Sequence, residues 1–313
     1  MSFDSSMPNS CSRRSFLTKS LMASGAVLLG GTAFADTRSW QKPDSRIAGV
    51  QIGTITYSYR SMPHTIEQLL QYITESGISA VELMGDAVEA YAGKPAEKPE
   101  VAMWRAGVSI KKFREIKKMF HKAGVRIYAF KPDALGPQHT DAEIEYAMRV
   151  AKVLGAHSVT VELPKDPAHS QRLGNLAAKH KIYVGYHNHT QGNDQAWLTA
   201  LSQSAYNSIN LDCGHYIAAG GNNTRETLLA FIDANHKRIT SFHMKDRQTK
   251  DNGAGNLPWG EGNTPIKDIL TLLKTKKYDI PVSIELEYKI PEGSNAVKEV
   301  NKCLEYARAA LLG

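Results

Sequence analysis

The chain has 313 residues, of which 42% are hydrophobic, 22% charged and 8% aromatic. This composition excludes a disordered chain, a collagen-like chain and a polytopic membrane protein. The formal net charge of +7, from 38 Lys and Arg against 31 Asp and Glu, raises nucleic acid as a partner, and three cysteines are too few for a disulfide scaffold.

The first 35 residues show the features of an export signal in order. The Arg-Arg pair at 13–14 precedes Ser-Phe-Leu, a mildly apolar run at 21–29 and an Ala-Phe-Ala cleavage site at 33–35. The apolar run is too short and too rich in Gly and Ser to span a bilayer, which argues against an uncleaved anchor. The arginine pair resembles a twin-arginine signal. We expect residues 1–35 to be cleaved, residues 36–313 to be periplasmic, and the twin-arginine export machinery to be a partner.

Cleavage changes the charge argument. Residues 1–35 contain three basic side chains and one acidic one, so the remaining 278 residues carry 35 basic and 30 acidic groups, a net charge of +5. Cys11 is lost as well, and a disulfide between Cys213 and Cys303 is left open. We expect no membrane association after cleavage and no nucleic-acid partner.

Short β-branched runs alternate with amphipathic stretches along the rest of the chain. Strands are expected at 47–55, 78–84, 125–130, 158–163, 182–187, 209–212, 239–244 and 282–286. Helices are expected at 64–75, 109–123, 141–154, 168–180, 194–204, 224–235, 265–275 and 295–311. Gly77, Gly124 and Gly155 suit helix C-termini, and Pro265 suits a first helical position. Long loops are expected around Pro95 and Pro99 and over 248–263.

Eight strands, each followed by a helix, predict a parallel sheet. Eight such units, at about 35 residues each, predict one α/β domain that closes as a single (β/α)₈ TIM barrel. A doubly wound open sheet is the alternative, but no G-x-G-x-x-G follows the first strand. The lysines at 111, 112, 117 and 118 are interpreted as a solvated helix face.

Ionisable groups end seven of the eight expected strands, and the active site of such a barrel lies at that end. Buried charges are costly unless they are paired or bind a metal. A mixture of imidazole and carboxylate is typical of a divalent-metal site, here Mn, Zn, Co, Fe or Mg. The alternative is an ion-paired polar core without metal. The candidate ligands are Glu162, His187, Asp212, His243 and Glu285.

Several motifs resemble the xylose-isomerase-like barrel superfamily, which includes sugar phosphate isomerases and epimerases, inosose dehydratases and type-IV apurinic endonucleases. They are Leu-Asp-x-Gly-His at 211–215, His-x-Lys-Asp at 243–246, Ile-Glu-Leu at 284–286, Gly-Glu-Gly at 260–262 and Tyr-His-Asn-His at 186–189. The resemblance covers the whole of 36–313. It is specific for the superfamily and weak for the substrate.

The resemblance implies a metal site with Glu on strand five, Asp on six, His on seven and Glu on eight. Asp212, His243 and Glu285 match this pattern, whereas His187 stands where the family commonly has Glu. Either His187 or Glu162 on strand four therefore completes the set. Glu287 is the alternative ligand to Glu285, because it lies two residues further along the strand and on the same face.

Other polar residues are candidates for catalysis or substrate binding. Glu162, His187, His189 and Glu285 are the proton-transfer candidates, and Lys245 could polarise a carbonyl or form a salt bridge. The candidates for substrate binding are His215, Lys131, Trp259 and Glu287. For these, the alternatives are a supporting role for His215, a salt bridge for Lys131 and an exposed loop anchor for Trp259.

These residues predict a metal-dependent sugar isomerase or epimerase that removes a proton next to a carbonyl and forms an enediolate. A 3-keto-glycoside lyase or dehydratase, and a sugar-binding barrel without activity, are the alternatives. The family's nucleases have extra His ligands on strands two and three, where this chain has Glu82 and Lys131, and it also lacks an Asp-x-His after strand seven. The sequence leaves the sugar, the metal and a homo-oligomer open.

Overall fold

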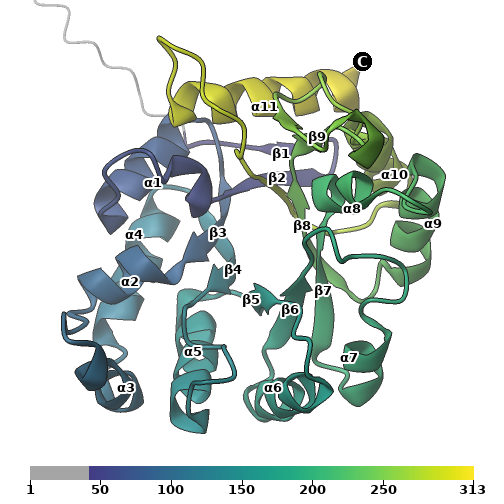
Figure 1. Cartoon of the computed structure of the whole chain (residues 1–313). Helices are drawn as coiled ribbons and strands as arrows, with labels where there is room; N and C mark the ends of the chain where they lie inside the picture. The colour runs from purple at the N-terminus through teal and green to yellow at the C-terminus, as the bar shows by residue number, and fades with distance from the viewer. Residues whose placement is uncertain (1–41) are drawn as a thin grey trace, which may run out of the picture. The chain divides into compact units, whose positions relative to one another are not determined.

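Eight parallel strands close into a ring in the computed structural model, which describes residues 42–313 (Figure 1). The strands pair in chain order, and the ring closes because β2 pairs with both β3 and β11. The single TIM barrel predicted from the sequence is confirmed, whereas the expected signal peptide and its cleavage site lie outside the described residues. The barrel strands are β2 (Val50–Ile55), β3 (Ala80–Met84), β4 (Arg126–Lys131), β5 (Ser158–Glu162), β6 (Tyr183–His187), β7 (Asn207–Asp212), β8 (Ile239–Met244) and β11 (Val282–Ile284).

Helices surround the ring, and their apolar faces pack against it (Figure 1). In α5, Thr140 and Glu143 form a capping box and Gly155 ends the helix in the left-handed conformation, as predicted. No described helix is long and apolar enough to cross a membrane. The helices are α1 (Ile66–Glu75), α2 (Gly85–Tyr91), α3 (Lys98–Gly107), α4 (Lys111–Lys122), α5 (Asp141–Leu154), α6 (Pro167–His180), α7 (Leu198–Gln203), α8 (Cys213–Ala219), α9 (Arg225–Asn235), α10 (Ile266–Lys276) and α11 (Ala296–Leu312).

The segment that follows β3 is not the long loop expected from its prolines. It contains α2 and α3, and Pro99 lies in the first turn of α3, where its missing N–H costs nothing. Arg105 of α3 is buried and pairs with Glu89 of α2 and Glu143 of α5. These ion pairs attach the extra helices to the barrel wall.

Three other local expectations were correct only in part. The expected strand 47–55 contains the barrel strand β2, but its start belongs to a hairpin, in which β1 (Arg46–Ile47) turns back on β2 through left-handed Ala48 and Gly49. The expected loop 248–263 contains a 3₁₀ turn, η2 (Lys250–Asn252), and β10 (Asn256–Leu257), which pairs with β9 (Asp246–Arg247). The helix expected at 194–204 is confined to α7, and α8 was not expected at all.

The interior of the barrel is polar, in contrast to the branched apolar layers that commonly fill such barrels. Tyr128 and Ser283 are buried and hydrogen-bonded to each other, and Glu82 accepts a hydrogen bond from Thr160 at 2.6 Å. Tyr128 also leaves no room for a Cβ on Gly53. The strands therefore carry a hydrogen-bonded polar network directly beneath their C-terminal ends.

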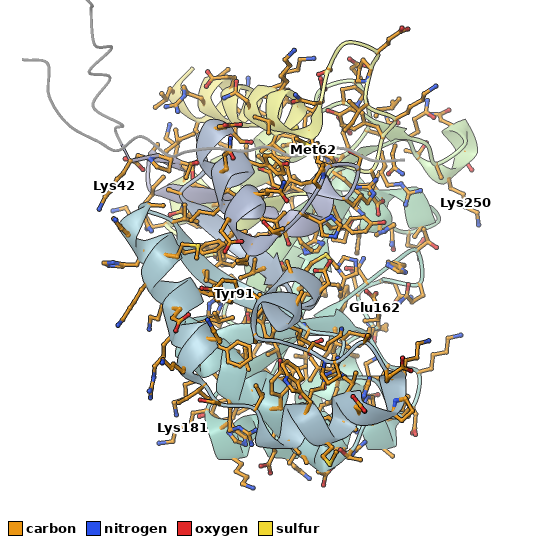
Figure 2. The ribbon with its side chains drawn as sticks, turned by 90° about the vertical axis from the view of Figure 1, so that its left-hand side faces the viewer. Lys42, Met62, Tyr91, Glu162, Lys181 and Lys250 are labelled. Carbon is orange, nitrogen blue, oxygen red and sulfur yellow. The ribbon has the colours of Figure 1, made fainter. Side chains whose placement is uncertain are left out.

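The two ends of the barrel are seen from the side in Figure 2. Lys42 and Lys181, which come before strands, lie on the left, and Glu162, the last residue of β5, lies on the right.

Cys213 and Cys303 are both buried and free, so no disulfide joins them.

Candidate active site

Four predicted site residues lie together where their strands end. His187 and Asp212 are the last residues of β6 and β7, His243 is one residue from the end of β8, and Glu285 follows β11 directly. Donor atoms of His187, Asp212 and His243 all lie within 4.8 Å of one another, and all three residues are buried. This spacing suits ligands that share one metal ion.

The imidazole of His187 is held as a neutral ring with one free nitrogen. Its Nδ1 lies 2.8 Å from Oδ1 of Asn210, and Nδ2 of Asn210 donates to Oγ of Ser241 at 2.7 Å. Because the amide N–H is used on Ser241, Asn210 accepts the Nδ1–H of His187 and leaves Nε2 unprotonated. Burial, assisted by the charge of His243, lowers the pKa of His187 well below its usual value. His187 is therefore in the form that binds metal.

The carboxylate of Asp212 has one occupied and one free oxygen. Oδ1 caps α8 by accepting the backbone N–H of His215 at 2.6 Å. Oδ2 is buried and accepts no hydrogen bond, although Lys245 Nζ lies 3.1 Å away and His187 Nε2 3.9 Å away. Burial raises the pKa of Asp212 to about 7, against the opposing charge of Lys245. A buried oxygen without a hydrogen bond, facing a free imidazole nitrogen, is what a metal site requires.

His243 lies between two carboxylates. Its Nε2 lies 2.9 Å from Glu82 and its Nδ1 3.0 Å from Glu285. Burial alone would lower the pKa of His243, but these two carboxylates outweigh it and raise the pKa to about 10. The ring therefore carries both protons here, and it can bind a metal only after one nitrogen loses its proton.

Lys245 supplies the compensating charge. Its Nζ lies 3.1 Å from Asp212 and 2.8 Å from each of Glu285 and Glu287. Burial opposes the charged form, yet the three carboxylates raise the pKa of Lys245. Lys245 therefore forms the salt bridges that were one of its two predicted roles. It also lies next to the candidate metal ligands.

Glu162 and Lys131 form a separate pair on the neighbouring strands. Lys131 Nζ lies 3.0 Å from Glu162, and the other oxygen of Glu162 lies 3.3 Å from His189 Nε2. The Glu162 side chain is about half exposed. It is not among the described residues whose donor atoms converge, so the geometry favours His187 over Glu162 as the ligand beside Asp212.

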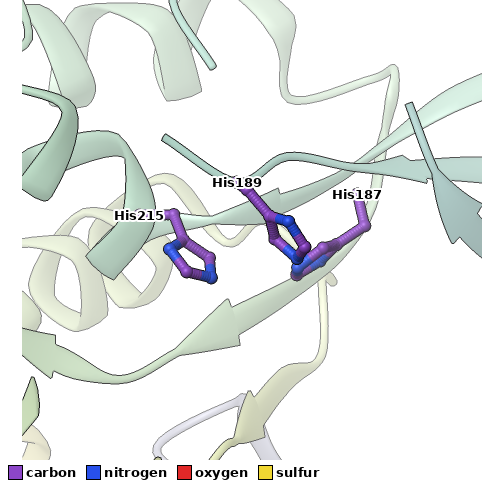
Figure 3. Close-up of side chains that lie close together, drawn as sticks. All are labelled: His187, His189 and His215. Carbon is purple, nitrogen blue, oxygen red and sulfur yellow. The ribbon is translucent and has the colours of Figure 1, made fainter. Parts of the chain in front are cut away.

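His187 also belongs to a row of three histidines, with His189 and His215 beside it (Figure 3). The ring centroid of His189 is 5.2 Å from that of His187 and 4.8 Å from that of His215. His215 faces two cations, since Lys245 and Arg247 lie 3.1 Å and 2.5 Å from its ring nitrogens. Burial and these charges lower the pKa of His215 to about 2, so the ring stays neutral at the edge of the site.

Trp259 is not the exposed loop anchor that was the alternative prediction for it. Its side chain is buried, and its ring packs edge-on against Tyr306 of α11 at 6.0 Å. This packing leaves little of the indole face for a sugar. Glu287, by contrast, stays partly exposed beside Lys245, where it can meet a substrate.

The sequence motifs at 243–246 and 260–262 turn out to be parts of one structure. The carboxylate of Asp246 accepts the backbone N–H groups of Gly260, Gly262 and Thr264 at 2.8–3.0 Å. Gly262 lies so close that an added Cβ would overlap the Asp246 carboxylate. The Gly-Glu-Gly turn therefore anchors the segment that positions Lys245.

Two supporting residues are not identified by the sequence. Glu82 stands where the family's nucleases have a His ligand, and in the structure it is the buried partner of His243. Asn210 faces His187 only because β6 and β7 pair in that register. A carboxylate within a predicted barrel strand is a signal that could have pointed to Glu82. No signal in the sequence indicates the strand register that places Asn210 beside His187.

The donor set fits a divalent ion. It offers a neutral imidazole nitrogen, a carboxylate oxygen without a hydrogen bond and a second imidazole, with Glu285 in contact with that imidazole. His187, Asp212 and His243 would hold the ion, with Glu285 as the adjoining carboxylate. The positive charge of Lys245 now balances the same carboxylates.

Comparison with known proteins gives one family. A family model described as a xylose isomerase-like TIM barrel matches residues 70–307. A search of curated protein sequences finds no match.

Solved structures with this fold are similar at low sequence identity. A probable 3-DHS dehydratase from Bacillus anthracis is 16% identical with a TM-score of 0.61, over 82% of this chain and 98% of that one. D-Psicose 3-epimerase from Clostridium cellulolyticum is 12% identical with a TM-score of 0.60, over 84% and 99%. 3-Keto-D-glucoside 4-epimerase from E. coli is 14% identical with a TM-score of 0.57, over 83% and 99%. At these identities the likeness establishes the fold alone.

Proposed function

The chain belongs to the xylose isomerase-like TIM barrel family, and from this premise we propose that it is a divalent-metal-dependent isomerase or epimerase of a free or keto sugar. The observation that carries the proposal is the convergence of His187, Asp212 and His243 with a buried Asp212 oxygen that accepts no hydrogen bond. Two of the similar structures are named as sugar epimerases, which supports the reaction class.

Bound at these residues, the cation would supply Lewis acidity to the sugar carbonyl and so acidify the neighbouring C–H. The protein's own groups would then move the proton. Glu285 is buried, and the charges of His243 and Lys245 hold its pKa well below the usual value despite that burial. It is therefore an ionised carboxylate, which is the form that a general base requires, although the same two cations weaken its basicity. Lys245 would donate a hydrogen bond to the oxygen on which negative charge develops.

A second proton-transfer group lies across the mouth. Glu285 follows β11, whereas Glu162 ends β5, and these strands are four places apart in a ring of eight. His189 contacts Glu162 on that far side. Groups on opposite sides of a bound sugar can remove a proton from one face and return it to the other, which is the requirement of epimerisation.

Elimination is the alternative reaction of the same groups. If the carbon next to the enediolate carries a leaving group, its departure gives a lyase or dehydratase instead, and His189 would donate the proton to the departing oxygen. A barrel that binds sugars without reacting is the non-enzymatic alternative.

Deuterium incorporation tests the proposal. The metal-loaded full chain is incubated in D₂O with D-fructose, D-psicose, D-tagatose or 3-keto-D-glucose, and the sugars are followed by NMR. We expect deuterium at the C–H next to the carbonyl of at least one sugar, together with its epimer or isomer. An alkene product would indicate elimination, and tight sugar binding without any exchange would contradict the enzymatic proposal.

We also propose that the chain is exported by the twin-arginine route and acts in the periplasm. Support comes from the sequence at 13–35 alone. N-terminal sequencing of protein from a periplasmic fraction should begin at Asp36. Replacement of Arg13 and Arg14 by Lys should leave the unprocessed chain in the cytoplasm, and unchanged export of that variant would contradict this route.

A further inference from the structure

A cavity of about 550 Å³ lies beside the candidate active site. Its walls are the loops that follow β4 and β5, together with His169 of α6. These loops belong to the C-terminal face of the barrel, where substrates bind. The volume falls within the range of ligand pockets and is more than one sugar ring needs.

Much of the lining of this cavity is apolar. The apolar residues are Pro132, Pro137, Leu163 and Pro164, together with Leu135, which is buried. Proline rings and leucine side chains suit a flat hydrocarbon group. The lining has two lysines and three carboxylates, so it offers no excess positive charge for a phosphate. These residues are Lys131, Lys165, Asp133, Glu162 and Asp166.

The cavity wall is held by the protein itself. The Nε2 of buried His169 lies 2.8 Å from the carbonyl oxygen of Leu135, which ties the loop after β4 to α6. Lys131 and Glu162 join the two loops through their ion pair. Because a hydrogen bond and an ion pair already hold these loops together, they need little ordering when a ligand binds.

The cavity adjoins the histidine cluster through Glu162. This residue lines the cavity and also lies 3.3 Å from His189, whose ring neighbours that of His187. A sugar bound at His187 and Asp212 would therefore have this cavity on its Glu162 side, where a substituent of the sugar would extend.

We propose that this cavity binds the apolar aryl aglycone of a glycoside, and that an aryl glycoside of a keto sugar is therefore the preferred substrate among the sugars proposed above. The position of the sugar ring rests on the proposed function. The apolar residues of the lining, the near-balanced charges and the continuity through Glu162 do not depend on which reaction follows.

Unreactive glycosides test the cavity apart from the chemistry. The metal-loaded full chain is titrated calorimetrically with 4-nitrophenyl and methyl glucosides and galactosides, in both anomers. Burial of an aryl ring predicts at least about tenfold tighter binding of one 4-nitrophenyl glycoside than of its methyl counterpart. Equal affinities, or no detectable binding of any 4-nitrophenyl glycoside, would overturn the proposal.

A cavity-filling variant locates the effect. Leu163→Trp should bring the affinities for the two glycosides within about twofold of each other by occupying the aglycone space. Leu198→Trp makes the same change at an exposed leucine of α7 and should keep the preference. A preference that survives Leu163→Trp would place the aryl group elsewhere and contradict the proposal.

The two proposals can fail separately. Deuterium exchange with a free keto sugar, but no preference for aryl glycosides, would reject the aglycone cavity and leave the reaction class intact. A preference lost in Leu163→Trp, without exchange of any keto sugar or keto glycoside, would keep the cavity and reject the enzymatic proposal.

Discussion

Asp212 joins three functions in one side chain. Its Oδ1 starts α8, its Oδ2 faces His187, and its charge is balanced by Lys245. The residue type and its place at a strand end were readable from the sequence. The different roles of its two oxygens could not be predicted from the sequence, because they depend on the turn into α8, which was not expected.

Replacing Asp212 by Asn separates metal binding from folding. The amide oxygen can still cap α8, but the charged ligand is lost. We expect metal content to fall at least about tenfold and activity to become undetectable, with little change in the melting temperature when both proteins are compared free of metal. Elemental analysis and thermal unfolding measure both.

Asp44→Asn is the matched control, because that exposed carboxylate also accepts one backbone N–H, from Arg46. It should leave metal content unchanged. Full metal content in Asp212→Asn would show that the ligand set is wrong.

Metal affinity should depend on pH. Without metal, Asp212 keeps a proton below a pKa of about 7, and His243 keeps both protons up to about 10. Metal binding must release these protons, so affinity should rise with pH, by up to about tenfold per pH unit for each proton released. Calorimetric titration with Mn²⁺ at pH 6, 7 and 8 measures this, and the slope should be steeper below pH 7. A pH-independent affinity would mean that other groups bind the metal.

At the scale of elements, sequence predicted the strands well because their apolar runs are bounded by glycine and polar residues. It failed where a local signal has two meanings. Pro99 reads as a loop residue but starts α3, and buried Arg105 gives that helix its attachment. Strand register is a property of the closed sheet, so the pairing of His187 with Asn210 could not be predicted.

The turn at 260–262 is the element most sensitive to a small change. Gly262→Ala would push a methyl group into the Asp246 carboxylate and disturb the segment that carries Lys245. We expect a loss of about 1–3 kcal/mol in the free energy of unfolding, measured by urea denaturation, and a higher KM. Gly107→Ala, at the end of α3, meets no atom within 4 Å and should be neutral. Equal stability of the two variants would contradict the anchoring role of the turn.

At the scale of the whole molecule, the closed ring places candidate proton-transfer groups on opposite sides of the mouth of the barrel. The sequence could place Glu285 and Glu162 at strand ends, but only ring closure puts them across from each other. The net charge that first raised nucleic acid belongs partly to exposed lysines of α4, as predicted. The informative charges are the few at the mouth.

Opposed bases predict a specific kinetic behaviour. In Glu162→Gln the far-side group is lost while Glu285 and the candidate ligands remain. We expect epimerisation to fall about 100-fold or more, while deuterium exchange persists with one of the two epimers. NMR of each epimer in D₂O measures both rates. Equal loss of exchange from both epimers would argue for a single base.

The metal content of the purified full chain tests the central claim most directly, since the proposed chemistry depends on the ion. Elemental analysis after extensive dialysis should find about one divalent ion per chain in the native protein and almost none in Asp212→Asn. Less than about 0.2 ion per chain in the native protein, even after incubation with Mn²⁺, Zn²⁺, Co²⁺, Fe²⁺ and Mg²⁺ in turn, would contradict a metal-dependent sugar enzyme and leave an ion-paired polar core.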